Sequence, residues 1–131
     1  MKFIEKLLSK NSSEKAVDIG KQGELIAEKI LKKQGYKIIE RNFNARIGEI
    51  DIIAQDGEYT CFVEVRMRKS SEHGTPAETV DKFKREKIIR AARIYVQKNN
   101  LHDKPLRFDV VAIEGNLSKY NYEVIKNAFE L

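Results

Sequence analysis

Three side chains near the middle of the chain have the residue types for metal and phosphate chemistry. Asp51 lies in the segment Gly48 to Gln55, and Glu64 and Arg66 lie in the segment Glu58 to Met67. Both segments are rich in β-branched and aromatic residues, which predicts two strands. Carboxylates suit Mg²⁺ or Mn²⁺, and a guanidinium binds phosphate in a bidentate manner. These residues therefore indicate a site for a divalent cation and phosphate oxygens.

The register of the predicted hairpin decides whether these side chains meet. Asp56-Gly57 is a strong signal for a two-residue turn, which would pair Gln55 with Glu58. Asp51 then becomes a diagonal neighbour of Glu64, about 7–8 Å away by backbone. Because strand side chains alternate between faces, both carboxylates are predicted on one face of the sheet.

Two interpretations of this acidic face stay open on the residues alone. Carboxylates placed this close repel each other, so a divalent cation would stabilise the pair. Alternatively, Arg66 and nearby lysines neutralise the acids in an ordinary surface cluster. Glu49, directly across from Glu64 in this register, would either position the site or pair with a nearby basic side chain.

Two further features could contact a substrate. Lys84, Lys87 and Arg90 recur at intervals of three on a predicted helix, and this basic stripe is suited to phosphate contacts. The alternative is a solvated helix face. His73 lies in the polar segment SSEHGTP, where it would approach a substrate or simply be solvated.

The composition favours a polyanionic partner in a reducing compartment. The chain has 131 residues and a formal net charge of +5, which makes nucleic acid the first candidate partner. Cys61 is the only cysteine, so no intrachain disulfide can form and a cytoplasmic location fits best. No apolar stretch approaches the ~20 residues of a membrane span, so no membrane association is expected.

The periodicity along the chain predicts an α/β fold. An amphipathic and polar arm is expected over residues 1–15, followed by a single domain over 16–131. The predicted order is helix, three strands, helix and two strands, which suggests a mixed sheet flanked by helices. The helices are expected over 18–34 and 78–99, and the strands over 36–41, 48–55, 58–67, 106–113 and 120–126. Small residues at the start of the first helix, Gly20 and Gly23, would let it pack closely.

Several sequence blocks resemble one known family. The run GKQGELIAEKILKKQGYKIIERNFNARIGEIDIIAQDGEYTCFVEVRMR resembles the YraN family of small restriction-endonuclease-like proteins, and so do the later segments TVDKFKREKIIRAARIYV, RFDVVAIEG and IKNAF. The blocks GEID, FVEVR and RFDVV occur in the order and spacing of that family. The resemblance covers nearly all of the chain from Gly20 to Phe129.

The resemblance implies a function as well as a fold. That family is similar to archaeal Holliday-junction resolvases and to the PD-(D/E)xK nucleases, whose site holds Mg²⁺ or Mn²⁺. The implied metal ligands are Glu24, Asp51, Glu64 and the backbone carbonyl of Val65, with Arg66 at the usual lysine position. The implied activity is phosphodiester hydrolysis at Asp51 and Glu64 on structured or branched DNA, and a homodimer follows by analogy with the resolvases.

Arg66 is the main departure from the general nuclease signature. A lysine at that position can orient or deprotonate the attacking water, whereas an arginine keeps its charge and does not act as a base near neutral pH. The YraN pattern accepts either residue. Two further functions therefore stand beside the nuclease: a non-catalytic module that binds nucleic acid, and a protein-interaction adaptor of the same fold.

Overall fold

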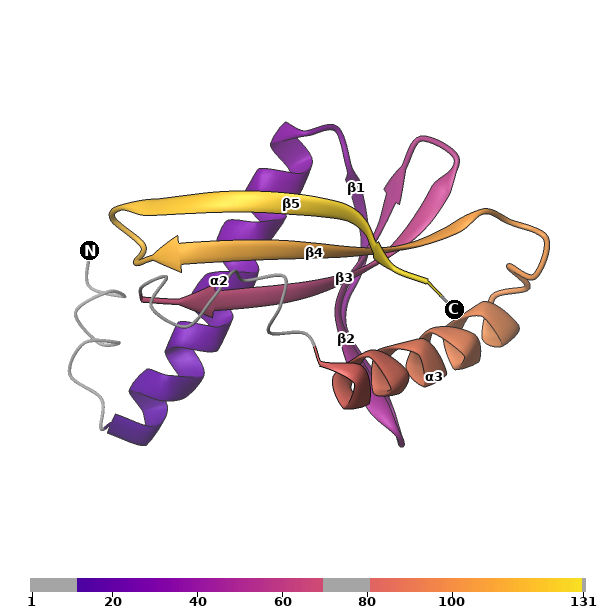
Figure 1. The fold of residues 1–131 in the computed structure, drawn as a ribbon, viewed down its shortest axis with the longest axis horizontal. Helices are drawn as coiled ribbons and strands as arrows, with labels where there is room; N and C mark the ends of the chain where they lie inside the picture. Colours follow the sequence, from indigo (N-terminus) through magenta and orange to yellow (C-terminus); the bar gives the residue numbers. More distant parts are fainter. Residues whose placement is uncertain (1–11, 70–80, 131) are drawn as a thin grey trace.

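The structure is a computed structural model that describes residues 12–69 and 81–130, with side chains described from residue 20 (Figure 1). These residues form a five-stranded mixed sheet and two helices, which confirms the predicted α/β class. The elements are α2 (Ser12–Lys33), β1 (Lys37–Ala45), β2 (Gly48–Asp56), β3 (Tyr59–Arg68), α3 (Lys82–Lys98), β4 (Leu106–Gly115) and β5 (Tyr120–Phe129).

The strands lie in the sheet in the same order as in the sequence, from β1 to β5. Neighbouring strands are antiparallel except β3 and β4, which are parallel. A parallel pair needs a crossover, and α3 lies in the connection between these two strands. In Figure 1, α2 and α3 lie at different ends of the sheet and β2 runs between them.

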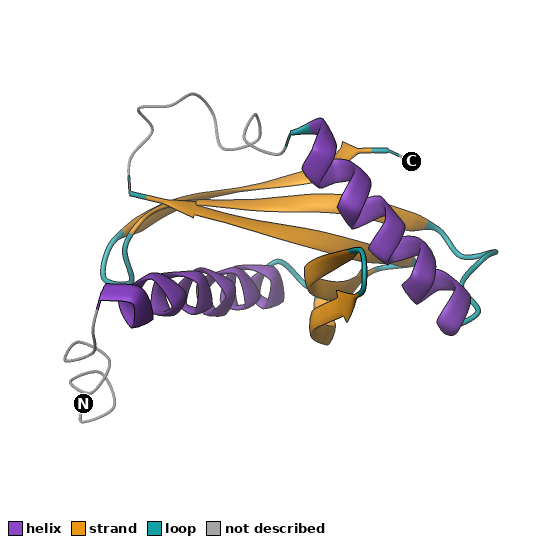
Figure 2. Ribbon diagram, turned by 90° about the horizontal axis from the view of Figure 1, so that it is seen from below, coloured by secondary structure: helices purple, strands orange, loops and turns teal. Residues whose placement is uncertain are grey.

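Each helix covers its own hydrophobic core. Ile26, Ala27, Ile30 and Leu31 of α2 pack on alternate residues of the central strands, among them Cys61, Val63 and Val111. Ile88, Ala91, Ala92, Tyr95 and Val96 of α3 pack on the other set, among them Phe62 and Phe108. The sheet therefore lies between two apolar layers. Figure 2 shows its strands nearly edge-on.

The helix limits differ from those predicted. The first helix begins at Ser12 instead of Asp18, so residues 12–15 belong to α2 and not to a polar arm. The rest of that arm lies outside the described residues. The second helix was expected from Glu78 but begins at Lys82, because the Asp81 side chain accepts a hydrogen bond from the Lys84 N–H at 2.8 Å and caps the helix. Neither helix, over the part of the chain described, is long and apolar enough to cross a membrane.

The predicted hairpin register is wrong, because the two-residue turn lies one residue later than predicted. Asp56 pairs with Tyr59 and Gln55 pairs with Thr60, so the two turn residues are Gly57 and Glu58. Gly57 has φ +61° and comes first in the turn, which is the position that favours glycine in a type II′ hairpin. Each residue of β2 thus pairs two residues further along β3 than predicted. A shift of two does not by itself move a side chain to the other face of the sheet.

One of the two small residues of α2 allows close packing. Gly23 is buried, and a Cβ atom built there would lie 3.2 Å from the Cβ atom of Met67 on β3. Gly20 is exposed and has nothing within 4 Å of the corresponding position. The predicted close approach is therefore made at Gly23, next to Glu24.

Candidate functional site

Asp51 lies where β2 stops alternating between the two faces of the sheet. Ile50 and Ile53 both lie in the core under α3, whereas Ile52 lies in the core under α2. Strict alternation would place Ile50 and Ile52 on one face. The backbone therefore twists at Asp51, and the Asp51 side chain lines a hollow beside each helix.

The neighbouring strand β1 is irregular at the same level. Arg41 contacts Glu28 on α2, but Phe43 lies in the core under α3. Asn42 between them has φ +52°, a conformation that asparagine tolerates better than most residues. Side-chain alternation thus breaks in both strands, which explains how a carboxylate from the sheet can face both helices.

Asp51 and Glu64 form a carboxylate pair. The corrected register pairs Ile52 with Val63, so Asp51 is beside Glu64 and not diagonal to it. The Val65 N–H donates to Asp51 Oδ2 at 2.8 Å. Asp51 is also close enough to Glu64 for its negative charge to raise the pKa of the Glu64 carboxyl.

Burial makes Glu64 unusual. Its exposed fraction is only 4%, and burial followed by the negative charge of Asp51 raises its pKa to about 8. The charges of Lys84 and Arg66 oppose this rise without cancelling it. The positive charges around Glu64 therefore do not fully offset the cost of burying its negative charge. Functional acids are often found in such an environment.

Lys84 brings an ammonium group to this pair from the opposite layer. Its Nζ lies 3.5 Å from Glu64 Oε1. The buried stripe of α3 includes Ile88, Ala91 and Tyr95, and one turn before Ile88 that stripe reaches Lys84. The face of α3 that packs on the sheet therefore ends in a lysine that points at Glu64.

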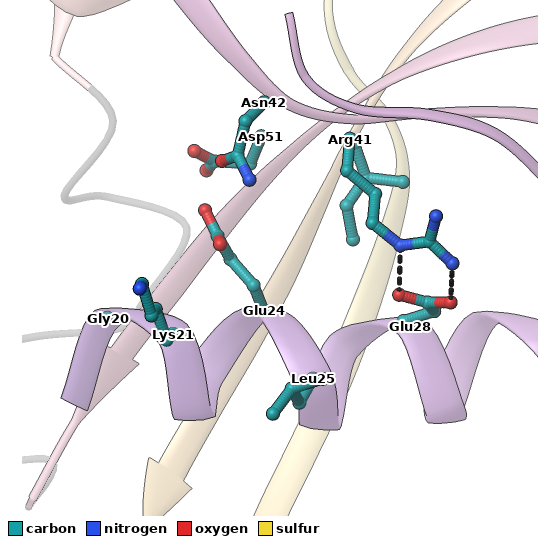
Figure 3. A pocket seen from close by; sticks show the side chains of 9 residues that line it. Gly20, Lys21, Glu24, Leu25, Glu28, Arg41, Asn42 and Asp51 are labelled. Carbon is teal, nitrogen blue, oxygen red and sulfur yellow. Dashed lines mark hydrogen bonds and ion pairs between the residues drawn. The ribbon is translucent and has the colours of Figure 1, made fainter. Parts of the chain in front are cut away.

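Glu24 reaches the other side of Asp51. Figure 3 shows the Glu24 side chain pointing from α2 toward Asn42 and Asp51. Burial and the charge of Asp51 raise the pKa of Glu24, and the charge of Glu49 adds to this rise. Glu28, one turn along, accepts two hydrogen bonds from Arg41, which lower its pKa to about 2. Of these two neighbouring acids, only Glu24 faces the carboxylate site.

Asn42 is a residue of this site that sequence reasoning missed. In the amide orientation that satisfies its hydrogen bonds, its nitrogen donates to Glu24 Oε1 at 2.8 Å and to Glu49 Oε1 at 3.3 Å. Glu49 is exposed, and its described partner is the Asn42 amide, although the sequence suggested that it could pair with Arg or Lys. Asparagine is depleted in strand interiors, and this is the signal that could have drawn attention to Asn42.

The predicted basic stripe divides in two. Lys84 and Lys87 line a hollow with Asp51, Glu64 and Glu49, while Arg90 is exposed further along α3. The whole of α3 is strongly basic. It contains one acid, Glu86, and seven basic residues: Lys82, Lys84, Arg85, Lys87, Arg90, Arg93 and Lys98. An anionic polymer lying along this helix would reach the carboxylate pair.

The donor set suits a cation that needs few protein ligands. In residues 12–69 and 81–130, no three His, Cys, Asp or Glu side chains converge closely enough to hold a metal ion. Asp51 and Glu64 are hard oxygen donors, and Mg²⁺ typically takes one or two carboxylates and keeps several water ligands. The pair fits such a cation, whereas direct ligation by Glu24 as well would require movement of its side chain.

The remaining predicted residues have different positions. Arg66 follows Glu64 by two residues on β3 and is partly buried. The N–H of Val65 is bonded to Asp51, and its carbonyl as a metal ligand stays a prediction. His73 lies outside the described residues. Cys61 is fully buried on the α2 side, and burial raises its pKa to about 12, as expected of a structural thiol.

Fold and site together define a small α/β protein with a carboxylate pair under a basic helix. The chain belongs to the family described as Uncharacterised protein family UPF0102, whose model matches residues 23–113. It is similar to a UPF0102 protein of Hahella chejuensis, with 47% identity over 88% of this chain and 92% of that protein. It is also similar to one of Clostridium kluyveri (45% identity over 87% and 95%) and one of Persephonella marina (46% over 86% and 93%). UPF0102 is the YraN family predicted from the sequence, and that prediction is thereby confirmed.

Proposed function

We propose that this chain is a Mg²⁺- or Mn²⁺-dependent nuclease of the restriction-endonuclease-like, PD-(D/E)xK type that cleaves structured or branched DNA. One observation carries the proposal: the buried Glu64 carboxyl lies against Asp51, directly beneath the basic helix α3. A buried carboxylate pair is costly for a fold unless a ligand uses it. Here the pair lies where a bound polyanion would present phosphate groups.

Each residue of the site has a role in such a reaction. Asp51 and Glu64 would hold the cation, with Glu24 acting through a water ligand. The cation would polarise the phosphate and lower the pKa of a bound water. The N–H of Val65 fixes one oxygen of Asp51 and leaves the other for binding. Asn42 would position Glu24 and Glu49 beside the pair, because its amide nitrogen donates a hydrogen bond to each of them.

Lys84 supplies a second positive charge beside Arg66. Arg66 stands where many related nucleases carry a lysine, and its guanidinium is suited to phosphate binding but not to proton transfer. The Lys84 ammonium, 3.5 Å from Glu64, could contact a phosphate oxygen and offset the charge that develops during hydrolysis. We therefore assign phosphate binding to Arg66 and Lys84 jointly, with Lys87 extending the contact.

Cleavage assays with matched variants test the proposal. The purified chain is incubated with Mg²⁺ or Mn²⁺ and with linear, flapped and four-way DNA, beside Asp51→Asn and Asp103→Asn. Asp51→Asn keeps an acceptor for the Val65 N–H but removes the charge, so cleavage should fall at least a hundredfold. Asp103 is an exposed loop acid, and its variant should cleave as the wild type does.

The same assays separate the alternatives. No cleavage of any substrate, or equal cleavage by Asp51→Asn, would exclude the nuclease. DNA binding without cleavage, with an affinity that falls steeply with salt, would instead identify a nucleic-acid-binding module that uses the basic helix. Absence of both activities would leave the adaptor function.

A further inference from the structure

An aromatic ring stands exposed at the start of the basic helix. Phe83 is the second residue of α3, and 67% of its surface is exposed. Its position is off the buried stripe of the helix, which reaches Lys84 instead. The hydrophobic core therefore does not account for a phenylalanine at this position.

The ring is coupled to the carboxylate site through a lysine. Lys87 Nζ lies over the Phe83 ring, 4.5 Å from its centroid, and Lys87 lines the same hollow as Asp51 and Glu64. Ile47, in the turn between β1 and β2, is another exposed apolar side chain at this hollow. An apolar surface and positive charge thus lie together beside the candidate metal ligands.

This combination is what single-stranded nucleic acid requires. Proteins that bind single strands use basic side chains to follow the phosphates and aromatic rings on which bases stack. In a continuous duplex, the bases already stack on each other and expose only their edges in the grooves. An exposed ring next to a lysine therefore favours DNA with unpaired nucleotides over a blunt duplex.

We propose that Phe83 is a stacking platform for an unpaired base, which Lys87 assists by binding the adjacent phosphate. The inference rests on the proposed function and names its substrate class: DNA with single-stranded nucleotides next to the cleavage site. The base stacked on Phe83 would hold the strand so that a nearby phosphate reaches Asp51 and Glu64. Flaps, frayed ends and the open centres of branched DNA present such nucleotides.

Equilibrium binding tests this inference in the absence of cleavage. The full chain is titrated, in EDTA and at one fixed salt concentration, into a labelled single strand, a flapped duplex and a blunt duplex. Phe83→Ala should weaken binding to the single strand and the flap about tenfold, the loss expected for one stacked base. Binding to the blunt duplex should change less than twofold, and Phe83→Trp should bind like the wild type.

A control on the same helix completes the design. Ile94 is also exposed on α3, at 39%, so Ile94→Ala removes apolar surface away from the site and should leave all three affinities unchanged. A 2-aminopurine base in the single strand reports stacking directly, and its quenching by the wild type should be lost in Phe83→Ala.

Two results would overturn the inference. They are unchanged single-strand affinity in Phe83→Ala and an equal loss of affinity for the single strand and the blunt duplex. If single-strand affinity is unchanged and the oligomeric state changes, Phe83 is instead a contact between copies of the chain. Because EDTA prevents metal-dependent cleavage, this test fails or succeeds independently of the Asp51→Asn assay.

Discussion

Two carboxylate clusters on the same sheet have opposite electrostatic environments. Asp51 and Glu64 form one cluster, and Asp56, five residues further along β2, belongs to the other with Asp109 of β4. Both clusters contain a fully or nearly fully buried acid, Glu64 in the first and Asp109 in the second. They differ in how many donors surround the acids.

In the cluster around Asp109, both carboxylate oxygens of Asp109 accept hydrogen bonds. Arg107 donates to Asp56 at 2.6 Å and to Asp109 at 2.8 Å, and the Tyr36 hydroxyl donates to Asp109 at 2.7 Å. The backbone N–H of Asn127 adds a bond at 2.9 Å. Burial alone would raise the pKa of Asp109, but these bonds hold it below its usual value.

The cluster around Glu64 has a different balance of charge. The negative charge of Asp51 lies beside Glu64, and the charges of Lys84, whose half-exposed ammonium is 3.5 Å away, and of Arg66 oppose the rise in the Glu64 pKa without cancelling it. Its pKa rises where that of Asp109 falls. This fold can thus satisfy a buried acid that serves structure, as it does at Asp109. A raised pKa at Glu64 is the pattern expected of an acid that binds a ligand, in agreement with the proposed function.

The largest effect is expected from breaking the structural cluster. Arg107→Ala leaves Asp109 buried without its bidentate partner, and removing one member of a buried ion pair costs about 3–5 kcal/mol. The free energy of unfolding, measured with urea at pH 7, should fall by that amount. DNA binding by α3 should persist at temperatures where the variant is folded.

Tyr36→Phe provides the graded control for that variant. It removes the hydrogen bond that Tyr36 donates to Asp109 and the one that it accepts from Arg107 but leaves the charge pair intact, so the loss should be about 1–2 kcal/mol. If Arg107→Ala were as stable as the wild type, the view of this cluster as structural would be wrong.

Glu64→Gln should raise the free energy of unfolding, whereas Arg107→Ala should lower it. A carboxyl with a pKa of about 8 in the folded state and 4.5 in the unfolded state keeps a proton on folding that the unfolded chain releases. Its contribution to stability is complete below pH 4.5 and is lost as the pH rises toward 8. Gln keeps a donor for Asp51 at every pH, so the variant should exceed the wild type by about 2 kcal/mol at pH 8 in EDTA.

The pH profile and the metal response sharpen this test. The difference in free energy of unfolding between Glu64→Gln and wild type should shrink as the pH falls toward 4.5. Asp56→Asn should instead be less stable than wild type, and this loss should disappear only in more acidic solution, because the Asp56 pKa is lowered chiefly by Arg107. At pH 8, Mg²⁺ should stabilise the wild type but not Glu64→Gln. A difference independent of pH would contradict the raised pKa of Glu64.

The sequence predicted the fold well because its elements are locally encoded. Alternation in β2 and β3, the glycine turn and the apolar stripe of α3 each select one secondary structure, and all five predicted strands occur. The start of α2 was misplaced because residues 12–15 are all polar and carry no apolar periodicity, although they form a helix. The turn was misplaced by one residue, since glycine can occupy either central position of a tight hairpin.

The site was predictable in membership but not in geometry. Asp51 and Glu64 were expected together, and the two-residue correction of register brought them closer without changing faces. The twist at Asp51 coincides with the positive φ of Asn42 at the same level of the neighbouring strand, and no local pattern in β2 predicts it. The approach of Lys84 to Glu64 depends on how α3 docks on the sheet, which is a property of tertiary packing.

Gly48 lies against α3, and changing it should have a smaller effect than Arg107→Ala. A Cβ atom on Gly48 would lie 2.5 Å from the Lys87 carbonyl oxygen, so Gly48→Ala must push α3 away from the start of β2. Overpacking of this kind costs about 1–2 kcal/mol. The Lys84 ammonium should retreat from Glu64, which would raise the pKa of Glu64 further and move the stability loss to higher pH.

Gly20→Ala is the matched control, because a Cβ atom there meets nothing within 4 Å and alanine favours a helix. That variant should be as stable as the wild type or slightly more stable, with an unchanged pH profile. An unaltered pH profile in Gly48→Ala would mean that Lys84 follows Glu64 despite the displaced helix. In that case the side chain of Lys84, and not the docking of α3, sets the charge at the carboxylate pair.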